Sequence, residues 1–149
     1  MKRIISLIFI LFLVGCNKKD FITCNVEVNN KLKNYTMSGT YKIYYDNNYV
    51  TNIEEKEIYI SSDKEIIEYF YESKDLDYYN LNDLYKGYNY EIKKDDTSVS
   101  ITSNIDMSLV DIKKMLKNKE IDKDYVISNK LTTSGAVKIY ESKGAICDI

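Results

Sequence analysis

The 149-residue sequence contains no histidine, no tryptophan and no proline, and only 5 glycines. Without histidine, the chain cannot form a Ser-His-Asp or Cys-His catalytic centre, and it has no imidazole ligand for a metal ion. Carboxylates such as Glu54, Glu55 and Glu57 are available for acid–base chemistry, but the pattern marks no buried pair and favours a charged outer strand face. We therefore expect no enzymatic activity, no catalytic residue and no cofactor.

The sequence also lacks an excess of positive charge. Its 21 Lys and Arg side chains are outnumbered by 23 Asp and Glu side chains, which gives a net charge of −2, and the two signs are interspersed. A protein that binds nucleic acid usually carries a basic patch or stripe. This balance therefore argues against a nucleic-acid partner.

Two short stretches fall short of functional motifs. The acidic run DLDYYNLND begins at Asp75, but Asn80 and Lys86 stand where a calcium-binding EF-hand loop needs glycine and glutamate. Ser134 and Lys138 are one residue farther apart than the S-x-x-K signature of penicillin-recognising enzymes. We interpret the first stretch as a solvated loop and Lys138 as a solvent-facing lysine, and we expect no metal site.

The first sixteen residues predict a leader and a lipid anchor. Lys2 and Arg3 precede the apolar run IISLIFILFLV, which is shorter than the about 20 residues of a membrane-spanning helix. The following LVGC resembles the bacterial lipobox, in which Cys16 is diacylglycerylated and the leader is cut before it. An ordinary signal peptide with a chance cysteine, or a buried helix, is the alternative. The lipobox divides the chain into a signal peptide (1–15), a lipidated anchor and tether (16–21) and one domain (22–149).

The lipobox also predicts where the domain lies. Two or three acyl chains such as palmitate hold a protein more stably than one chain does, so we expect it on the extracytoplasmic face of the cell membrane. Residues 17–21 span roughly 17 Å when extended. The start of the first strand should therefore face the bilayer, and it should lie closer to lipid than the turn at residues 46–48.

The two remaining cysteines, Cys24 and Cys147, would lie in a compartment where disulfides persist. We predict that they form a disulfide between the start of the first strand and the segment after the last helix. The alternative is two free thiols, with Cys24 buried in the core.

Hydrophobic periodicity predicts an α+β fold. Alternation indicates strands at residues 22–28, 35–45, 49–61, 88–93 and 99–105. Capping signals and apolar stripes indicate one helix from Ser62, a second short helix before Gly87, a third after Ser108 and a last one at residues 134–143. We expect an antiparallel sheet, made of a three-stranded meander plus a hairpin, that is covered on one face by helices.

Tyrosine is abundant, with 15 residues. Tyr41, Tyr45 and Tyr49 fall on the first predicted hairpin, where aromatic rings with polar tips could bind a glycan or a peptide. The alternative is that tyrosine simply fills strands well and is over-used by an AT-rich genome.

The lipobox, the TC pair of the first strand, the YKIYYDNNYV hairpin and the late ESKGAIC segment together resemble the YehR-like group of small bacterial lipoproteins. The resemblance implies an α+β domain at the cell surface and no established reaction. We expect a non-catalytic, membrane-anchored lipoprotein that binds an envelope protein or glycan. The alternative is a small solute-binding or transporter-accessory lipoprotein, which a deep pocket with convergent polar groups would favour.

Overall fold

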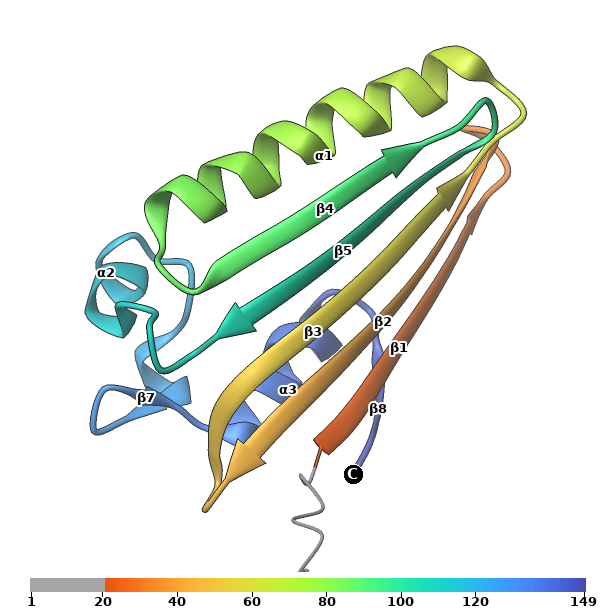
Figure 1. Ribbon diagram of the computed structural model, residues 1–149. Coiled ribbons are helices and arrows are strands. Elements are labelled where there is room, and N and C mark those ends of the chain that lie inside the picture. Colours follow the sequence, from red (N-terminus) through yellow and green to blue (C-terminus); the bar gives the residue numbers. More distant parts are fainter. Residues whose placement is uncertain (1–20) are drawn as a thin grey trace, which may run out of the picture.

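The computed structural model describes residues 21–149, so the predicted signal peptide and Cys16 lie outside the described residues. Six strands form one antiparallel sheet in the order β4-β5-β3-β2-β1-β8 (Figure 1). They are β1 (Phe21–Asn30), β2 (Tyr35–Asp46), β3 (Tyr49–Ile60), β4 (Tyr88–Lys94), β5 (Ser98–Asp106) and β8 (Ile146–Asp148). Two short strands, β6 (Val126–Ile127) and β7 (Lys130–Leu131), pair separately. A mixed α+β fold with a large antiparallel sheet is confirmed, and β8 adds an edge strand that we did not predict.

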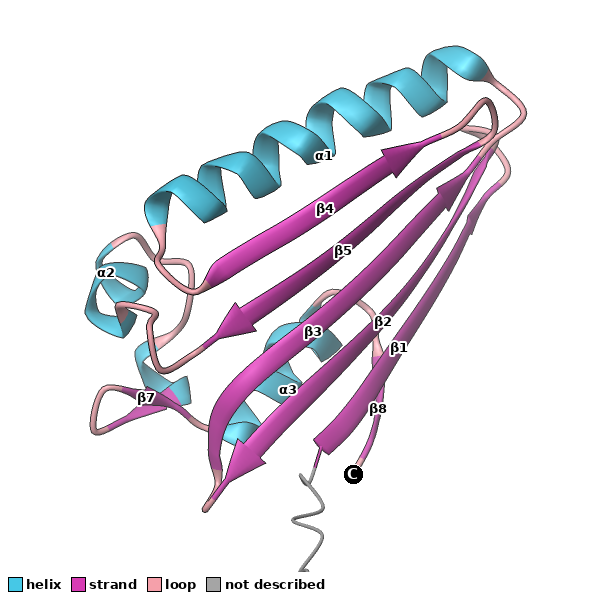
Figure 2. Ribbon diagram, in the orientation of Figure 1, coloured by secondary structure: helices cyan, strands magenta, loops and turns pink. Residues whose placement is uncertain are grey.

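The helices are α1 (Lys64–Leu84), α2 (Ile112–Lys117) and α3 (Thr133–Ser142), with a 3-10 turn, η1 (Lys123–Tyr125), before β6 (Figure 2). Asp63 caps α1 by accepting a hydrogen bond from the Glu65 amide at 2.9 Å, so the cap is one residue later than predicted. α1 continues through the run DLDYYNLND, where we predicted a loop and a second helix. No helix among residues 21–149 is long and apolar enough to cross a membrane.

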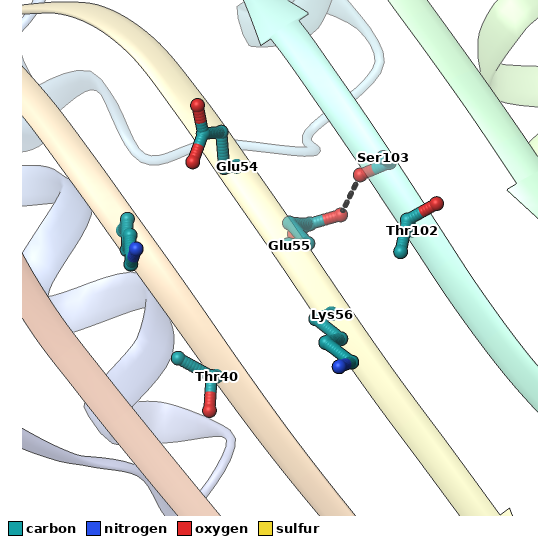
Figure 3. Close-up of a pocket in the computed structure, with 7 residues that line it drawn as sticks. Thr40, Glu54, Glu55, Lys56, Thr102 and Ser103 are labelled. Carbon is teal, nitrogen blue, oxygen red and sulfur yellow. Dashed lines mark hydrogen bonds between the residues drawn. The ribbon is translucent and has the colours of Figure 1, made fainter.

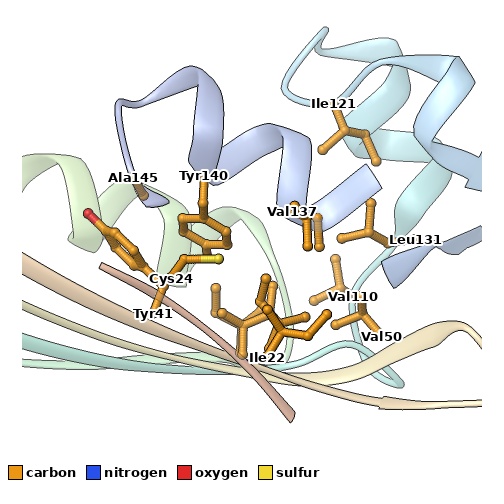
Figure 4. Close-up of a cluster of buried hydrophobic side chains, with 14 of the residues drawn as sticks. Ile22, Cys24, Tyr41, Val50, Val110, Ile121, Leu131, Val137, Tyr140 and Ala145 are labelled. Atoms are coloured by element: carbon orange, nitrogen blue, oxygen red, sulfur yellow. The ribbon is translucent and has the colours of Figure 1, made fainter. Parts of the chain in front are cut away.

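Strands β2, β3 and β5 alternate between a buried and a more exposed face, as the pleat requires. On β3, Ile53 and Tyr59 are buried, whereas Glu54 and Lys56 are exposed. The buried face packs against α1 and α3 in two apolar clusters. The larger includes Ile22 of β1 and Tyr140 of α3 (Figure 4). The smaller includes Tyr59, Ile67 of α1 and Val99 of β5.

Cys24 and Cys147 form a disulfide, as predicted. The two residues are direct cross-strand partners in the β1–β8 pair, and their Cα atoms are 3.9 Å apart. Cys24 is fully buried, so the bond joins the last strand of the chain to the core face of the first.

One predicted arrangement is wrong. Phe21 pairs with Tyr44, so the turn at residues 46–48 lies at the same end of the sheet as the start of β1. The turn between β1 and β2, which contains Leu32, lies at the opposite end (Figure 1). In a meander of three antiparallel strands, the turn between the second and third strands lies at the end of the sheet where the first strand begins.

Candidate functional site

Two carboxylates are buried on the helix-covered face of the sheet. Glu55 and Glu57 occupy alternate positions of β3 and are 9% and 7% exposed. We predicted an outer face for both, which is wrong: only Glu54 of the three carboxylates faces solvent. The strand reads Ile53, Glu55, Glu57 and Tyr59 along its inner face, and a buried charge is tolerated there only when hydrogen bonds or counter-charges compensate it.

Three hydroxyl groups from three different elements donate hydrogen bonds to Glu55. The Tyr140 hydroxyl of α3 lies 2.8 Å from Oε1. The Ser103 hydroxyl of β5 and the Tyr78 hydroxyl of α1 lie 2.6 Å and 3.3 Å from Oε2. Figure 3 shows the bond between Glu55 and Ser103 across neighbouring strands. Glu55 therefore ties both long helices to the middle of the sheet.

Glu57 has a different set of partners. Its Oε1 accepts a hydrogen bond from the Tyr41 hydroxyl at 2.9 Å, and its Oε2 accepts one from the Tyr59 hydroxyl at 2.8 Å. The Lys74 ammonium of α1 lies 3.8 Å from the same Oε2. Glu57 thus has a counter-charge, whereas no lysine or arginine of residues 21–149 forms an ion pair with Glu55.

The tyrosines around these carboxylates are held in their protonated form. Burial, reinforced by the charges of Glu55 and Glu57, raises the pKa of Tyr41, Tyr59 and Tyr78 well above the usual value of 10.0. Burial and Glu55 raise the pKa of Tyr140 in the same way. A protonated hydroxyl is what a carboxylate needs, because the ionised carboxylate can only accept hydrogen bonds.

A cavity of about 200 Å³ lies beside Glu55, between the sheet, α1, α2 and α3. Glu55, Tyr88 of β4 and Tyr140 contribute its polar groups. Its charged residues nearer solvent are Glu120 and Lys143, both of which are exposed. The apolar side chains that line the cavity include Leu81, Met107, Met115, Ile121, Leu131 and Ile139.

Tyr88 contributes a further polar group to the cavity. Burial and the charge of Glu55 raise the pKa of Tyr88. Its hydroxyl has no hydrogen-bond partner within the described part of the chain, although its ring lies 6.3 Å from that of Tyr85. The cavity adjoins a surface groove of about 670 Å³, since both are lined by Glu120, Ile121, Ile139 and Lys143. A small molecule could therefore enter from the groove.

The opposite face of the sheet carries a polar depression of about 410 Å³ (Figure 3). Thr40, Lys56 and Thr102 are direct partners across three strands at its centre, with Lys42 and Glu54 one row away. This depression contains no aromatic side chain. Its lining residues are polar, and Glu55 and Ser103 among them are buried, whereas the other five are partly or fully exposed.

The predicted aromatic surface does not form, because Tyr41 is only 1% exposed and its ring stacks on that of Tyr140, 4.4 Å away. Tyr45 is half-buried and packs against the larger core cluster. Tyr49 is also half-buried, with the Lys130 ammonium 5.4 Å from its ring centroid. The inner positions of a strand lie two residues apart, which is the signal that places Tyr41 on the buried face.

Sequence reasoning missed the cavity and the inward position of the two carboxylates. The alternation of β3 carried a signal for Glu55 and Glu57, because both share a face with Ile53. No local signal locates the cavity, whose walls come from three helices and four strands that are distant in sequence. Residues 21–149 contain no group of three or more acidic or cysteine side chains that could hold a metal ion.

Comparison with known proteins places the fold. No family model matches the chain, and no curated protein matches it. The NMR structure of the Escherichia coli YehR protein matches with 16% identity over 87% of this chain and 92% of that chain, at a TM-score of 0.54. The NMR structure of a protein from Streptococcus pneumoniae TIGR4 is similar over 99% of this chain and 98% of that chain, with 14% identity and a TM-score of 0.48. The chain has a YehR-like fold.

Proposed function

We propose that this chain is a lipid-anchored extracytoplasmic lipoprotein without catalytic activity, whose domain binds a small ligand in the cavity beside Glu55. The observation that supports this proposal is the cavity itself. Protein interiors are packed as densely as organic crystals, and voids larger than a water molecule are few. A partly open cavity of about 200 Å³ with a carboxylate and two tyrosines in its wall is therefore a feature that a ligand would explain.

The composition of the wall supports a ligand site in preference to a packing defect. An apolar void would destabilise the fold without compensation, because its lining atoms lose contacts. Here the apolar wall includes two methionines, whose flexible side chains suit small ligands of varied shape. Pockets for drug-sized ligands have volumes of roughly 300–1,000 Å³, so this cavity would take a smaller molecule.

Methionine methyl NMR tests this function directly. The chain has four methionines, of which Met107 and Met115 line the cavity and Met37 does not. The full chain, labelled with ¹³C at the methionine methyl groups, would be titrated with isopentylamine, isopentanol and isovalerate. We expect at least one probe to shift the signals of Met107 and Met115 and to leave that of Met37 in place.

A cavity-filling variant is the control for this experiment. Ile139→Trp should abolish the shifts, because the half-buried Ile139 lines the cavity and the indole would occupy its opening. Glu141→Trp places the same ring on an exposed position of the same helix and should leave the shifts intact. Absence of any response at Met107 and Met115 to all three probes would contradict the proposed function.

A further inference from the structure

We propose that the ligand of this cavity is a small organic ammonium ion with an apolar body, and that Glu55 binds its charge. This inference rests on the proposed function, because it assigns the chemical class of the molecule that occupies the same cavity.

The contrast between the two buried carboxylates is the first argument. Glu55 and Glu57 lie on the same face of the same strand, and both accept tyrosine hydrogen bonds. Only Glu57 has a lysine beside it, Lys74 at 3.8 Å. Three hydrogen bonds partly compensate the buried charge of Glu55, but no counter-charge balances it, and a cation would stabilise it further. Glu55 lines the cavity, and a ligand cation would supply what the described chain does not.

The hydrogen-bonding capacity of Glu55 agrees with this role. A carboxylate offers about four lone-pair positions, and three hydroxyl groups occupy three of them. Oε1 accepts a single hydrogen bond, from Tyr140. An ammonium group donates up to three hydrogen bonds, so Oε1 of Glu55 and the unpartnered Tyr88 hydroxyl are both suitable acceptors for it.

The other wall residues also favour a monovalent cation. The ring of Tyr88 lines the cavity, and aromatic faces attract ammonium groups, most strongly where water is excluded. The ring of Tyr140 already stacks on that of Tyr41 and has the Lys143 ammonium 4.9 Å from its centroid. The charged side chains of the lining are Glu55, Glu120 and Lys143, whose sum is −1. A ligand with one positive charge would neutralise this sum. The remaining wall is apolar, so the body of the ligand should be apolar too.

A matched pair of probes tests the charge. Isopentylamine and isopentanol have nearly the same size and shape, but at neutral pH only the amine is charged. We expect the amine to shift the Met107 and Met115 methyl signals with an affinity at least about tenfold higher than that of the alcohol, which is the usual effect of a hydrogen bond to a charged group. Equal affinities would overturn the assignment of an ammonium ligand without contradicting the proposed function.

A matched pair of variants tests the residue. Glu55→Gln keeps the shape of the side chain and removes its charge, so it should reduce amine affinity to the level of the alcohol. Glu57→Gln makes the same change two residues away, outside the cavity lining, and should leave amine affinity within about twofold. If Glu55→Gln binds the amine as tightly as the parent, the assignment to Glu55 is wrong. The comparison of amine with alcohol on the parent chain needs no variant, so it decides the ligand class even if Glu55→Gln does not fold.

Discussion

At the scale of single residues, the tyrosines of the core serve as hydrogen-bond donors to buried charge. Tyr140 is 3% exposed and Tyr78 is 7% exposed, yet the hydroxyl groups of both donate hydrogen bonds to Glu55. A buried tyrosine normally needs such a partner for its polar tip. The high tyrosine content of the chain is therefore partly explained by the two carboxylates on β3, and not by a binding surface on the first hairpin.

Alkaline pH should unfold the domain through these tyrosines. In the folded domain, burial and nearby carboxylates raise the pKa of four tyrosines above 10.0, the value for an unfolded tyrosine: Tyr41, Tyr59, Tyr78 and Tyr140. Their contribution to the free energy of unfolding is therefore complete below pH 10 and is lost as the pH rises above it. Above pH 10, each of these tyrosines should lower the free energy of unfolding by about 1.4 kcal/mol per pH unit. Together, the four would cancel a typical stability of about 5–15 kcal/mol within roughly one to three pH units.

The measurement is a pH titration followed by both circular dichroism and the near-ultraviolet absorbance of phenolate. We expect part of the phenolate signal to appear only in the same transition in which secondary structure is lost. If all tyrosines titrate while the domain remains folded, the buried hydrogen bonds to Glu55 and Glu57 do not have the strength inferred here.

At the scale of elements, the strands could be predicted from the sequence more fully than the helices. Alternation located all five long strands because each has one face that packs against the core. The extent of α1 was missed because DLDYYNLND resembles a polar loop. In the structure, Lys74, Tyr78 and Leu81 of this region continue the inward stripe of Ile67 and Phe70 at helical spacing. The Tyr90 hydroxyl of β4 also donates a 2.8 Å hydrogen bond to Asp75 of α1.

The edge strand β8 could not be predicted from its own residues. Ile146, Cys147 and Asp148 are too few to give a periodic signal, and β8 pairs with only three residues of β1. The predicted disulfide is the observation that pointed to this contact. Because the bond and the strand pairing bring the same two segments together, each reinforces the other.

Removing the disulfide should destabilise the domain and release β8. The bond joins residues 123 positions apart, and the chain-entropy model assigns up to about 4–5 kcal/mol to a loop of this length, although measured gains are often smaller. The double variant Cys24→Ser, Cys147→Ser should therefore unfold at a lower urea concentration than the oxidised parent. Hydrogen exchange should increase first at Ile146–Asp148. Chemical reduction of the parent is the control and should give a similar midpoint, whereas unchanged midpoints in both cases would contradict a stabilising bond.

At the scale of the whole molecule, the register of the sheet determines which end could face a membrane. Phe21 is 49% exposed at the start of β1, and the C-terminal strand β8 pairs near the same end. The turn with Asp46 lies there too, whereas Leu32 lies beyond the far end of β1 and is 100% exposed. A ten-residue strand is about 33 Å long at a rise of roughly 3.3 Å per residue. The turns that contain Leu32 and Asp46 therefore mark opposite ends of the sheet.

If Cys16 carries the lipid anchor, the end of the sheet that contains Asp46 should face the bilayer. Because β1 begins at Phe21, the tether is residues 17–20, which span roughly 14 Å at most and less than β1 itself. Nitroxide labels at Asp46→Cys and Leu32→Cys, on exposed turns at opposite ends, would be compared in membranes for their proximity to lipid. We expect the label at position 46 to contact lipid and the label at position 32 to remain in water.

Cys16→Ala should release both labelled proteins from the membrane, because loss of the acyl chains leaves no stable anchor. Equal lipid proximity at the two positions would mean that the domain lies flat, and retention of the Cys16→Ala chain in the membrane would contradict the lipid anchor.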